Sequence, residues 1–228
     1  MVKISAGSYD LNTFLYGGYE TDIVSVLYGG PGTGKTNFCL MAAVSQAKKG
    51  NRVIFIDSEG GFSTERIKQL AGEDYDKVLT NIFLLKPTNF SEQKKSFEEL
   101  LKYLKEEVSL IVVDGMTILY RLELAEAHSK SEHAVHAVNS DLVKQITILA
   151  EIARKRGICV LITNQVYTWQ DEEKMVGGDI LKYWAKCHLE IVKHDGKRTL
   201  YLKKHRSLPE KSFDFFITNN GIRKKGWI

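Results

Sequence analysis

One short run of residues has the types and spacing needed to bind a phosphate group. Its eight positions match a phosphate-binding loop: Gly29, Gly30, Pro31, Gly32, Thr33, Gly34, Lys35 and Thr36. In such a loop, glycines let backbone N–H groups converge on phosphate oxygens. Lys35 would reach the β- and γ-phosphates, and the Thr36 hydroxyl would ligate Mg²⁺. A chance glycine-rich turn is the alternative, but we predict a site for ATP and Mg²⁺.

Polar side chains at the ends of three apolar runs could complete this site. Asp114 follows residues 110–113, where a carboxylate can hold Mg²⁺ through water, although strand-end aspartates also cap turns. Glu59 follows residues 53–56 and could polarise the attacking water as a general base. A solvated loop glutamate is an equally good interpretation of Glu59. Gln165 could sense the γ-phosphate, although the residues alone favour a polar strand end.

The spacing of apolar residues predicts the elements that must position these groups. Buried strands are expected at residues 23–27, 53–56, 82–85, 108–113 and 158–163. Helices are expected at residues 37–49, 92–107 and 133–156, with Ser91 as the N-cap of the second helix. This alternation predicts an α/β fold with a mostly parallel central sheet and helices on both faces.

The pattern changes after residue 178. Residues 187–192 and 199–203 flank Asp195-Gly196, which is a hairpin signal, and residues 213–217 predict a further strand. We expect these antiparallel strands at the C-terminal end to extend one edge of the same sheet. Because no linker rich in Pro, Gly or Ser interrupts the chain, we predict one domain covering residues 1–228.

Composition limits the class of protein. The chain has 228 residues, of which 43% are hydrophobic, and this is enough for a full core. No apolar run approaches the ~20 residues that span a bilayer, and the N-terminus lacks a signal-peptide pattern. The three cysteines have neither disulfide nor zinc spacing. We therefore expect a soluble, reduced, cytoplasmic protein that does not bind membranes.

Positive charge is concentrated towards the C-terminus. Residues 182–228 contain 12 Lys and Arg but 4 Asp and Glu, whereas residues 1–181 contain 20 and 24. A basic end on an acidic body indicates a polyanion partner such as nucleic acid, or else a solvated lysine-rich face. Aromatic rings and cations that would suit single-stranded DNA also lie close together: Tyr167, Trp169, Lys174, Lys182 and Lys186.

Taken together, these residues resemble the RecA superfamily, in particular its archaeal RadA/RadB branch. The similarity covers nearly the whole chain and includes residues 4–8, 56–60, 65–67, 113–114, 163–166, 177–178, 208–210 and 217–222. Its most specific part is the order Glu59, Gln165 and Gly177-Gly178. The resemblance implies a RecA-like ATPase core that binds ATP, Mg²⁺ and DNA in repair and recombination.

The resemblance also implies roles for single residues. Glu59 would be the catalytic base and Gln165 the nucleotide sensor. Arg66 would lie near the adenine base, which a guanidinium can stack on. Lys204 and Arg206 would enter the ATP site of an adjacent subunit, although a basic hairpin edge that contacts solvent or DNA is an equal alternative.

Other features depart from the family pattern. We expect a chain that begins at the ATPase core, without the helix–hairpin–helix domain and polymerisation linker that precede it in RadA. The resemblance implies DNA-facing loops at residues 167–176 and 121–136, but the first contains acidic residues 171–173 and the second has few basic ones. We therefore expect a weak ATPase that assists recombination and does not perform strand exchange alone. Its expected partners are a RadA-like recombinase, a junction-cleaving nuclease or further copies of itself.

Two other functions are weighed against this one. A KaiC-like regulatory ATPase that acts on protein partners would also use the basic segment 204–206 and the acidic segment 171–173. A small-molecule P-loop kinase would carry lid arginines that clamp a second phosphate, and the sequence has no such segment. A DNA-binding ATPase of recombination is our main prediction.

Overall fold

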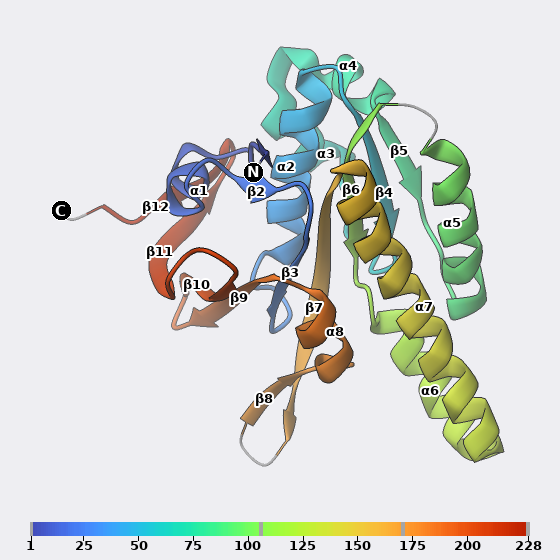
Figure 1. Cartoon of the computed structure of the whole chain (residues 1–228). Helices are drawn as coiled ribbons and strands as arrows, with labels where there is room; N and C mark the ends of the chain where they lie inside the picture. The colour runs from blue at the N-terminus through green and yellow to red at the C-terminus, as the bar shows by residue number, and fades with distance from the viewer. Residues whose placement is uncertain (1, 105–106, 170–171, 227–228) are drawn as a thin grey trace.

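The computed structural model describes residues 2–104, 107–169 and 172–226, without the side chains of residues 168–174. A mixed sheet of ten strands forms the centre of the molecule (Figure 1). Its parallel part has the order β3-β7-β6-β4-β5. The strands are β3 (Val24–Gly29), β4 (Arg52–Asp57), β5 (Ile82–Leu85), β6 (Val108–Asp114) and β7 (Cys159–Trp169). All five predicted strands are therefore confirmed.

Helices cover both faces of this sheet, which explains the unbroken apolar runs of its strands. In β4, Phe55 packs into one core cluster, whereas Ile54 and Ile56 pack into the other. The first cluster is covered by α1 (Tyr9–Phe14), α2 (Lys35–Lys48), α3 (Thr64–Ala71), the 3₁₀ turn Gly72–Asp74 and α4 (Tyr75–Thr80). The second is covered by α5 (Phe90–Tyr103), α6 (Ile118–Lys130), α7 (Glu132–Arg156) and α8 (Gly178–Trp184). No helix within the described ranges is long and apolar enough to cross a membrane.

Four C-terminal strands extend the sheet beyond β3; the first three were predicted and the fourth, β12, was not. They are β9 (Cys187–His194), β10 (Lys197–His205), β11 (Lys211–Thr218) and β12 (Gly221–Lys224). β9 pairs parallel to β3, and each later strand pairs antiparallel to the one before it. At the β9–β10 turn, Asp195 and Gly196 have φ of 47° and 76°, the positive values that a two-residue hairpin turn favours.

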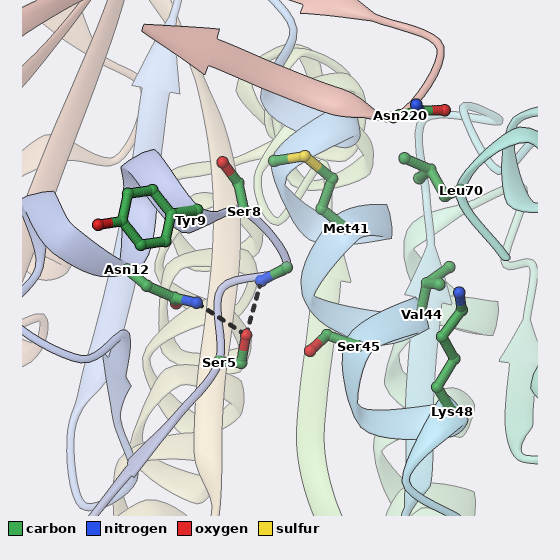
Figure 2. Close-up of a pocket in the computed structure, with 11 residues that line it drawn as sticks. Ser5, Ser8, Tyr9, Asn12, Met41, Val44, Ser45, Lys48, Leu70 and Asn220 are labelled. Atoms are coloured by element: carbon green, nitrogen blue, oxygen red, sulfur yellow. Dashed lines mark hydrogen bonds between the residues drawn. The ribbon is translucent and has the colours of Figure 1, made fainter.

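The N-terminal segment packs against α2. β1 (Lys3–Ile4) and β2 (Tyr19–Glu20) form a separate antiparallel pair. Between them, Gly7 lies so close to α2 that a Cβ would be 2.2 Å from the Met41 carbonyl oxygen. The Ser5 hydroxyl oxygen accepts hydrogen bonds from the Gly7 N–H and the Asn12 side chain (Figure 2). A cleft of about 380 Å³ opens between this segment and α2.

The start of α5 differs from the prediction. The N-cap is Asn89, not Ser91: its backbone is extended and its side chain accepts the Glu92 N–H at 2.9 Å. The Glu92 carboxylate accepts the Thr88 N–H at 2.8 Å, which completes a reciprocal cap. Ser91 lies within the first turn. The predicted end at residue 107 was also wrong, because the helix ends at Tyr103; residues 105–106 lie outside the described range.

Both segments that the resemblance implied to be loops have regular structure. Residues 121–136 form most of α6 and the first turn of α7, with a single break at Ser131, whose side chain accepts the Ala134 N–H at 3.2 Å. The many Leu, Ala and Glu residues of α6 favour helix. Residues 167–176 are also not a simple loop, because β7 continues to Trp169 and pairs antiparallel with β8 (Glu172–Met175). The β7–β8 hairpin and the α6–α7 junction extend from the same end of the molecule (Figure 1).

The capping contact at α5 can be tested by substitution. Asn89→Ala removes the acceptor of the Glu92 N–H and should lower the free energy of unfolding by about 1 kcal/mol. Ser91→Ala, two residues along and exposed, is the matched control and should change it by less than about 0.5 kcal/mol. Urea unfolding followed by circular dichroism measures both; equal effects would contradict the assignment of the cap.

Candidate nucleotide site

The carboxyl ends of four adjacent strands meet at one edge of the sheet. In the parallel register, Gly29 of β3 lies beside Gln165 of β7, and Asp57 of β4 lies beside Asp114 of β6. The phosphate loop, residues 29–36, leaves this edge and leads directly into α2. The fold therefore brings together the loop and the strand-end side chains that the sequence indicated.

The phosphate loop surrounds a cavity of about 170 Å³ lined by Gly32, Gly34, Lys35, Thr36 and Glu59. Gly34 caps α2 with φ of 110°, so the helix N-terminus faces the cavity with its positive end. The Lys35 ammonium group donates to the carbonyls of Gly29 at 3.0 Å and Gly30 at 2.9 Å. Burial lowers the pKa of Lys35, an effect that Glu59 and Asp114 oppose. This arrangement can hold a polyphosphate.

The C-terminal strands support the phosphate loop from outside. A Cβ on Gly29 would lie 2.1 Å from the Ile191 carbonyl oxygen of β9, and one on Gly34 would lie 2.8 Å from Ile217 Cδ1 of β11. Arg198 of β10 donates from Nε to the Thr33 carbonyl at 3.2 Å. These long-range contacts were not predicted from the sequence, because nothing local to Arg198 indicates its partner.

Asp114 lies at the end of β6 and is fully buried. Its Oδ1 accepts the Thr163 hydroxyl at 2.6 Å, and that hydroxyl oxygen accepts the Gly115 N–H at 2.7 Å. Within the described residues, Oδ2 has no hydrogen-bond partner. Burial raises the pKa of Asp114 to about 6, although the Thr163 hydroxyl and the nearby Thr36 hydroxyl act in the opposite direction. A buried carboxylate oxygen without a partner, close to the loop that carries Thr36, fits a hydrated Mg²⁺.

Glu59, which lines the cavity, contacts Gln165 at the end of β7. Gln165 Nε2 donates to Glu59 Oε1 at 2.7 Å, although the two residues are 106 positions apart. The loop that carries Glu59 is folded by Asp57, whose carboxylate accepts the N–H groups of Gly60, Gly61 and Phe62 at 2.8, 3.0 and 3.0 Å. We did not select Asp57 from the sequence, although an aspartate three residues before a Gly-Gly pair is a turn signal.

A family model described as Rad51 matches residues 1–225. The chain belongs to the Rad51 family. A DNA repair and recombination protein RadB of Methanobrevibacter smithii is 39% identical over 223 residues, covering 93% of this chain and 92% of the relative. RadB proteins of Methanocaldococcus jannaschii and Methanoculleus marisnigri are each 38% identical, covering 93% and 97% of this chain and 98% and 97% of their own lengths. These similarities confirm the resemblance to the archaeal RadA/RadB branch and the RecA-like fold class.

Arg66 has structural partners in this Rad51-family chain. Its Nε donates to Asn37 Oδ1 of α2 at 2.8 Å, and its Nη atoms donate to the carbonyls of Thr218 at 2.8 Å and Asn219 at 3.1 Å. The guanidinium therefore joins α2 and α3 to the β11–β12 turn. The predicted contact with an adenine base stays a prediction.

Lys204 and Arg206, predicted to reach a neighbouring subunit, contact their own chain. Lys204 Nζ donates to the Lys182 carbonyl at 2.8 Å. Arg206 donates to Glu20 Oε2 at 2.7 Å and to both Asp22 carboxylate oxygens at 2.6 and 2.8 Å. β10 ends at His205, so Lys204 lies on the strand and Arg206 lies just beyond it. Their action across a subunit boundary stays a prediction.

Two of the residues predicted to bind DNA lie at the end of α8. Lys186 Nζ lies 5.4 Å from the centre of the Tyr183 ring and donates to the Tyr183 carbonyl at 2.8 Å. Lys204 reaches the neighbouring Lys182 carbonyl, so three lysines gather where α8 ends and its carbonyls carry partial negative charge. Tyr183 is 70% exposed. An accessible ring beside several cations suits base stacking and backbone contact.

The other three lie on the β7–β8 hairpin. Tyr167 is 37% exposed and pairs in register with Lys174. The side chains of Trp169 and Lys174 lie outside the described part of the chain, as do those of acidic residues 171–173. The structure therefore places these positions on one hairpin next to α8, and their contact with DNA stays a prediction.

The raised pKa of Asp114 predicts how stability depends on pH. The unfolded carboxyl ionises near pH 3.8 and the folded one near pH 6, so the folded state binds more protons between these values. Stability contributed by this residue should fall as pH rises through that window. The free energy of unfolding of Asp114→Asn should therefore exceed that of the parent by up to about 3 kcal/mol above pH 6. The two values should be nearly equal near pH 4. Urea unfolding without nucleotide or Mg²⁺ tests this; a difference that does not vary with pH would contradict it.

Proposed function

We propose that this chain is an ATP- and DNA-binding accessory protein of DNA repair and homologous recombination, built as a single RecA-like ATPase domain. The Rad51 match and the names of the RadB relatives support the biological role. One observation carries the chemistry: Glu59, which lines the phosphate-loop cavity, accepts a hydrogen bond from Gln165. A carboxylate, an amide and a cation thus surround the place where a γ-phosphate would lie.

Binding of ATP uses groups that are already in position. The Lys35 ammonium group, which rests on two loop carbonyls, exchanges them for phosphate oxygens when nucleotide enters. The Thr36 hydroxyl would ligate Mg²⁺, and the buried Asp114 carboxylate would hold it through water. The cation, when bound, neutralises charge on the β- and γ-phosphates. Arg66, which is held against α2 by Asn37, would lie near the adenine base.

Hydrolysis depends on Glu59 as general base and Gln165 as sensor. Glu59 is exposed and its Oε1 accepts the Gln165 amide, so this oxygen is not free to accept a proton from water until that contact changes. A γ-phosphate offers the Gln165 amide an alternative acceptor and so frees Glu59. Slow, regulated turnover follows from this competition.

DNA contact is assigned to the surface formed by α8 and the β7–β8 hairpin. Lys182, Lys186 and Tyr183 supply cations and a ring there, and Tyr167 is exposed on the hairpin. Full strand exchange is not proposed, because the segment expected to be a second DNA loop is the α6–α7 hairpin. Protein partners are a RadA-like recombinase or a junction-cleaving nuclease, with Lys204 and Arg206 available to a neighbouring copy only after release from their own chain.

The phosphate-site assignment predicts opposite effects of two substitutions. Lys35→Ala should weaken binding of a fluorescent ATP analogue at least about tenfold, because it removes a charge-assisted contact. Glu59→Gln should keep that affinity within about twofold and lower phosphate release about 100-fold, because it removes only the general base. Retained ATP affinity in Lys35→Ala would overturn the site.

The DNA-binding assignment predicts a response to salt. Affinity for labelled single-stranded DNA, measured by fluorescence anisotropy, should fall with salt, and Lys182→Ala with Lys186→Ala should lower the slope of log affinity against log salt by about 1.4. Lys68→Ala with Lys77→Ala is the control, because these exposed lysines belong to α3 and α4 on the opposite face of the sheet. Equal changes in both double variants would argue for a general charge effect only.

A further inference from the structure

A buried amide lies directly behind the loop that carries Glu59. Gln93, on α5, has no exposed surface and sits in the cluster between the sheet and α5–α7. Its Oε1 accepts the Ser58 hydroxyl at 3.4 Å. Its Nε2 donates to the Met116 carbonyl at 3.2 Å and to Gln145 Oε1 at 2.7 Å. One side chain thus joins the β4–α3 loop, the β6–α6 loop and α7.

The partners of the Gln93 amide lie next to the residues proposed to act in ATP hydrolysis. Ser58 immediately precedes Glu59, and Met116 follows Asp114 by two residues. The Ser58 N–H also donates to the Asp114 carbonyl at 2.9 Å, so the same two loops are joined a second time. Gln93 therefore holds the strand ends that carry the general base and the metal-binding carboxylate in one fixed arrangement.

The hydrogen bonds of Gln93 leave its amide little freedom to change orientation. Both N–H groups and the oxygen of the Gln93 amide are used, and a buried amide without partners would be unfavourable. Gln145, which is 3% exposed, orients the Gln93 amide by accepting one of its N–H groups. Because Gln145 belongs to α7, the amide also ties the long helix to the catalytic edge of the sheet.

We infer that Gln93 is a positioning residue for ATP hydrolysis that acts on Glu59 through Ser58. The inference rests on the proposed function, in which Glu59 is the general base. Among the described residues, Gln93 has no hydrogen bond to the groups that would hold the phosphates. Lys35 donates to carbonyls of its own loop, and the loop itself is supported by β9, β10 and β11. Loss of the amide should therefore leave nucleotide binding intact and misplace the base.

The test separates turnover from binding. In Gln93→Met, kcat for ATP hydrolysis should fall about 10- to 100-fold, because small misplacements of a catalytic group have effects of this size. KM and the affinity for a fluorescent ATP analogue should stay within about twofold. Ser58→Ala removes the contact from the other end and should lower kcat in the same direction, and it carries the test if Gln93→Met does not fold.

A double substitution tests whether the effect runs through Glu59. In a Glu59→Gln background, Gln93→Met should lower the residual rate by less than about twofold, because residues that act as a unit are not additive. The control is Gln46→Met, which removes another buried glutamine, far along α2 from the phosphate loop, and should keep the parent kcat.

Several outcomes would overturn the inference. They are an unchanged kcat in both Ser58→Ala and a folded Gln93→Met, a loss confined to KM, or a full further loss in the Glu59→Gln background. Absence of ATP hydrolysis in the parent would overturn the proposed function as well. Hydrolysis in the parent that both substitutions leave intact would overturn the role of Gln93 alone.

Discussion

Gly29 stands where the parallel strands meet the antiparallel extension, and its backbone lies against the Ile191 carbonyl with no room for a side chain. β3 is paired on both sides at this point, by β7 and by β9. The phosphate loop therefore begins from a fixed backbone, and Arg198 and Ile217 hold its outer side. A loop that is ordered before its ligand arrives loses less entropy on binding. Strands β9–β12 would therefore contribute to nucleotide affinity without contacting the nucleotide.

The two buried aspartates at the strand ends have different roles, one structural and one chemical. The carboxylate of Asp57 has three backbone donors and serves the loop alone. Asp114 is paired at only one of its two oxygens, which is unfavourable in a buried site unless a cation or water completes it. Asp114 thus lowers the stability of the folded domain at the position where a metal ion would bind, as residues of functional sites commonly do.

Much of this arrangement could be predicted from the residues because its causes are local. The phosphate loop is a contiguous motif, and the parallel strands are buried on both faces, so both leave clear patterns at Gly29–Gly30 and in runs such as Val112–Val113. Other features depend on partners that are distant in sequence. Gln93 is an ordinary helix residue until Met116 and Gln145 are brought to it, 23 and 52 positions away. The prediction of two loops was wrong for a different reason. It came from the family resemblance, whereas the local composition of α6 favoured helix.

Because β9, β10 and β11 support the phosphate loop, the loop is made early in synthesis but gains its supporting contacts late. The loop emerges from the ribosome early, at residues 29–36, whereas the contacts that hold it come from residues 191, 198 and 217. Until β9 is added, β3 has an unpaired edge that other chains could occupy. Nucleotide can stabilise only molecules that bind it. ATP would therefore selectively retain chains whose last strands are in place, and would act as a check that folding is complete.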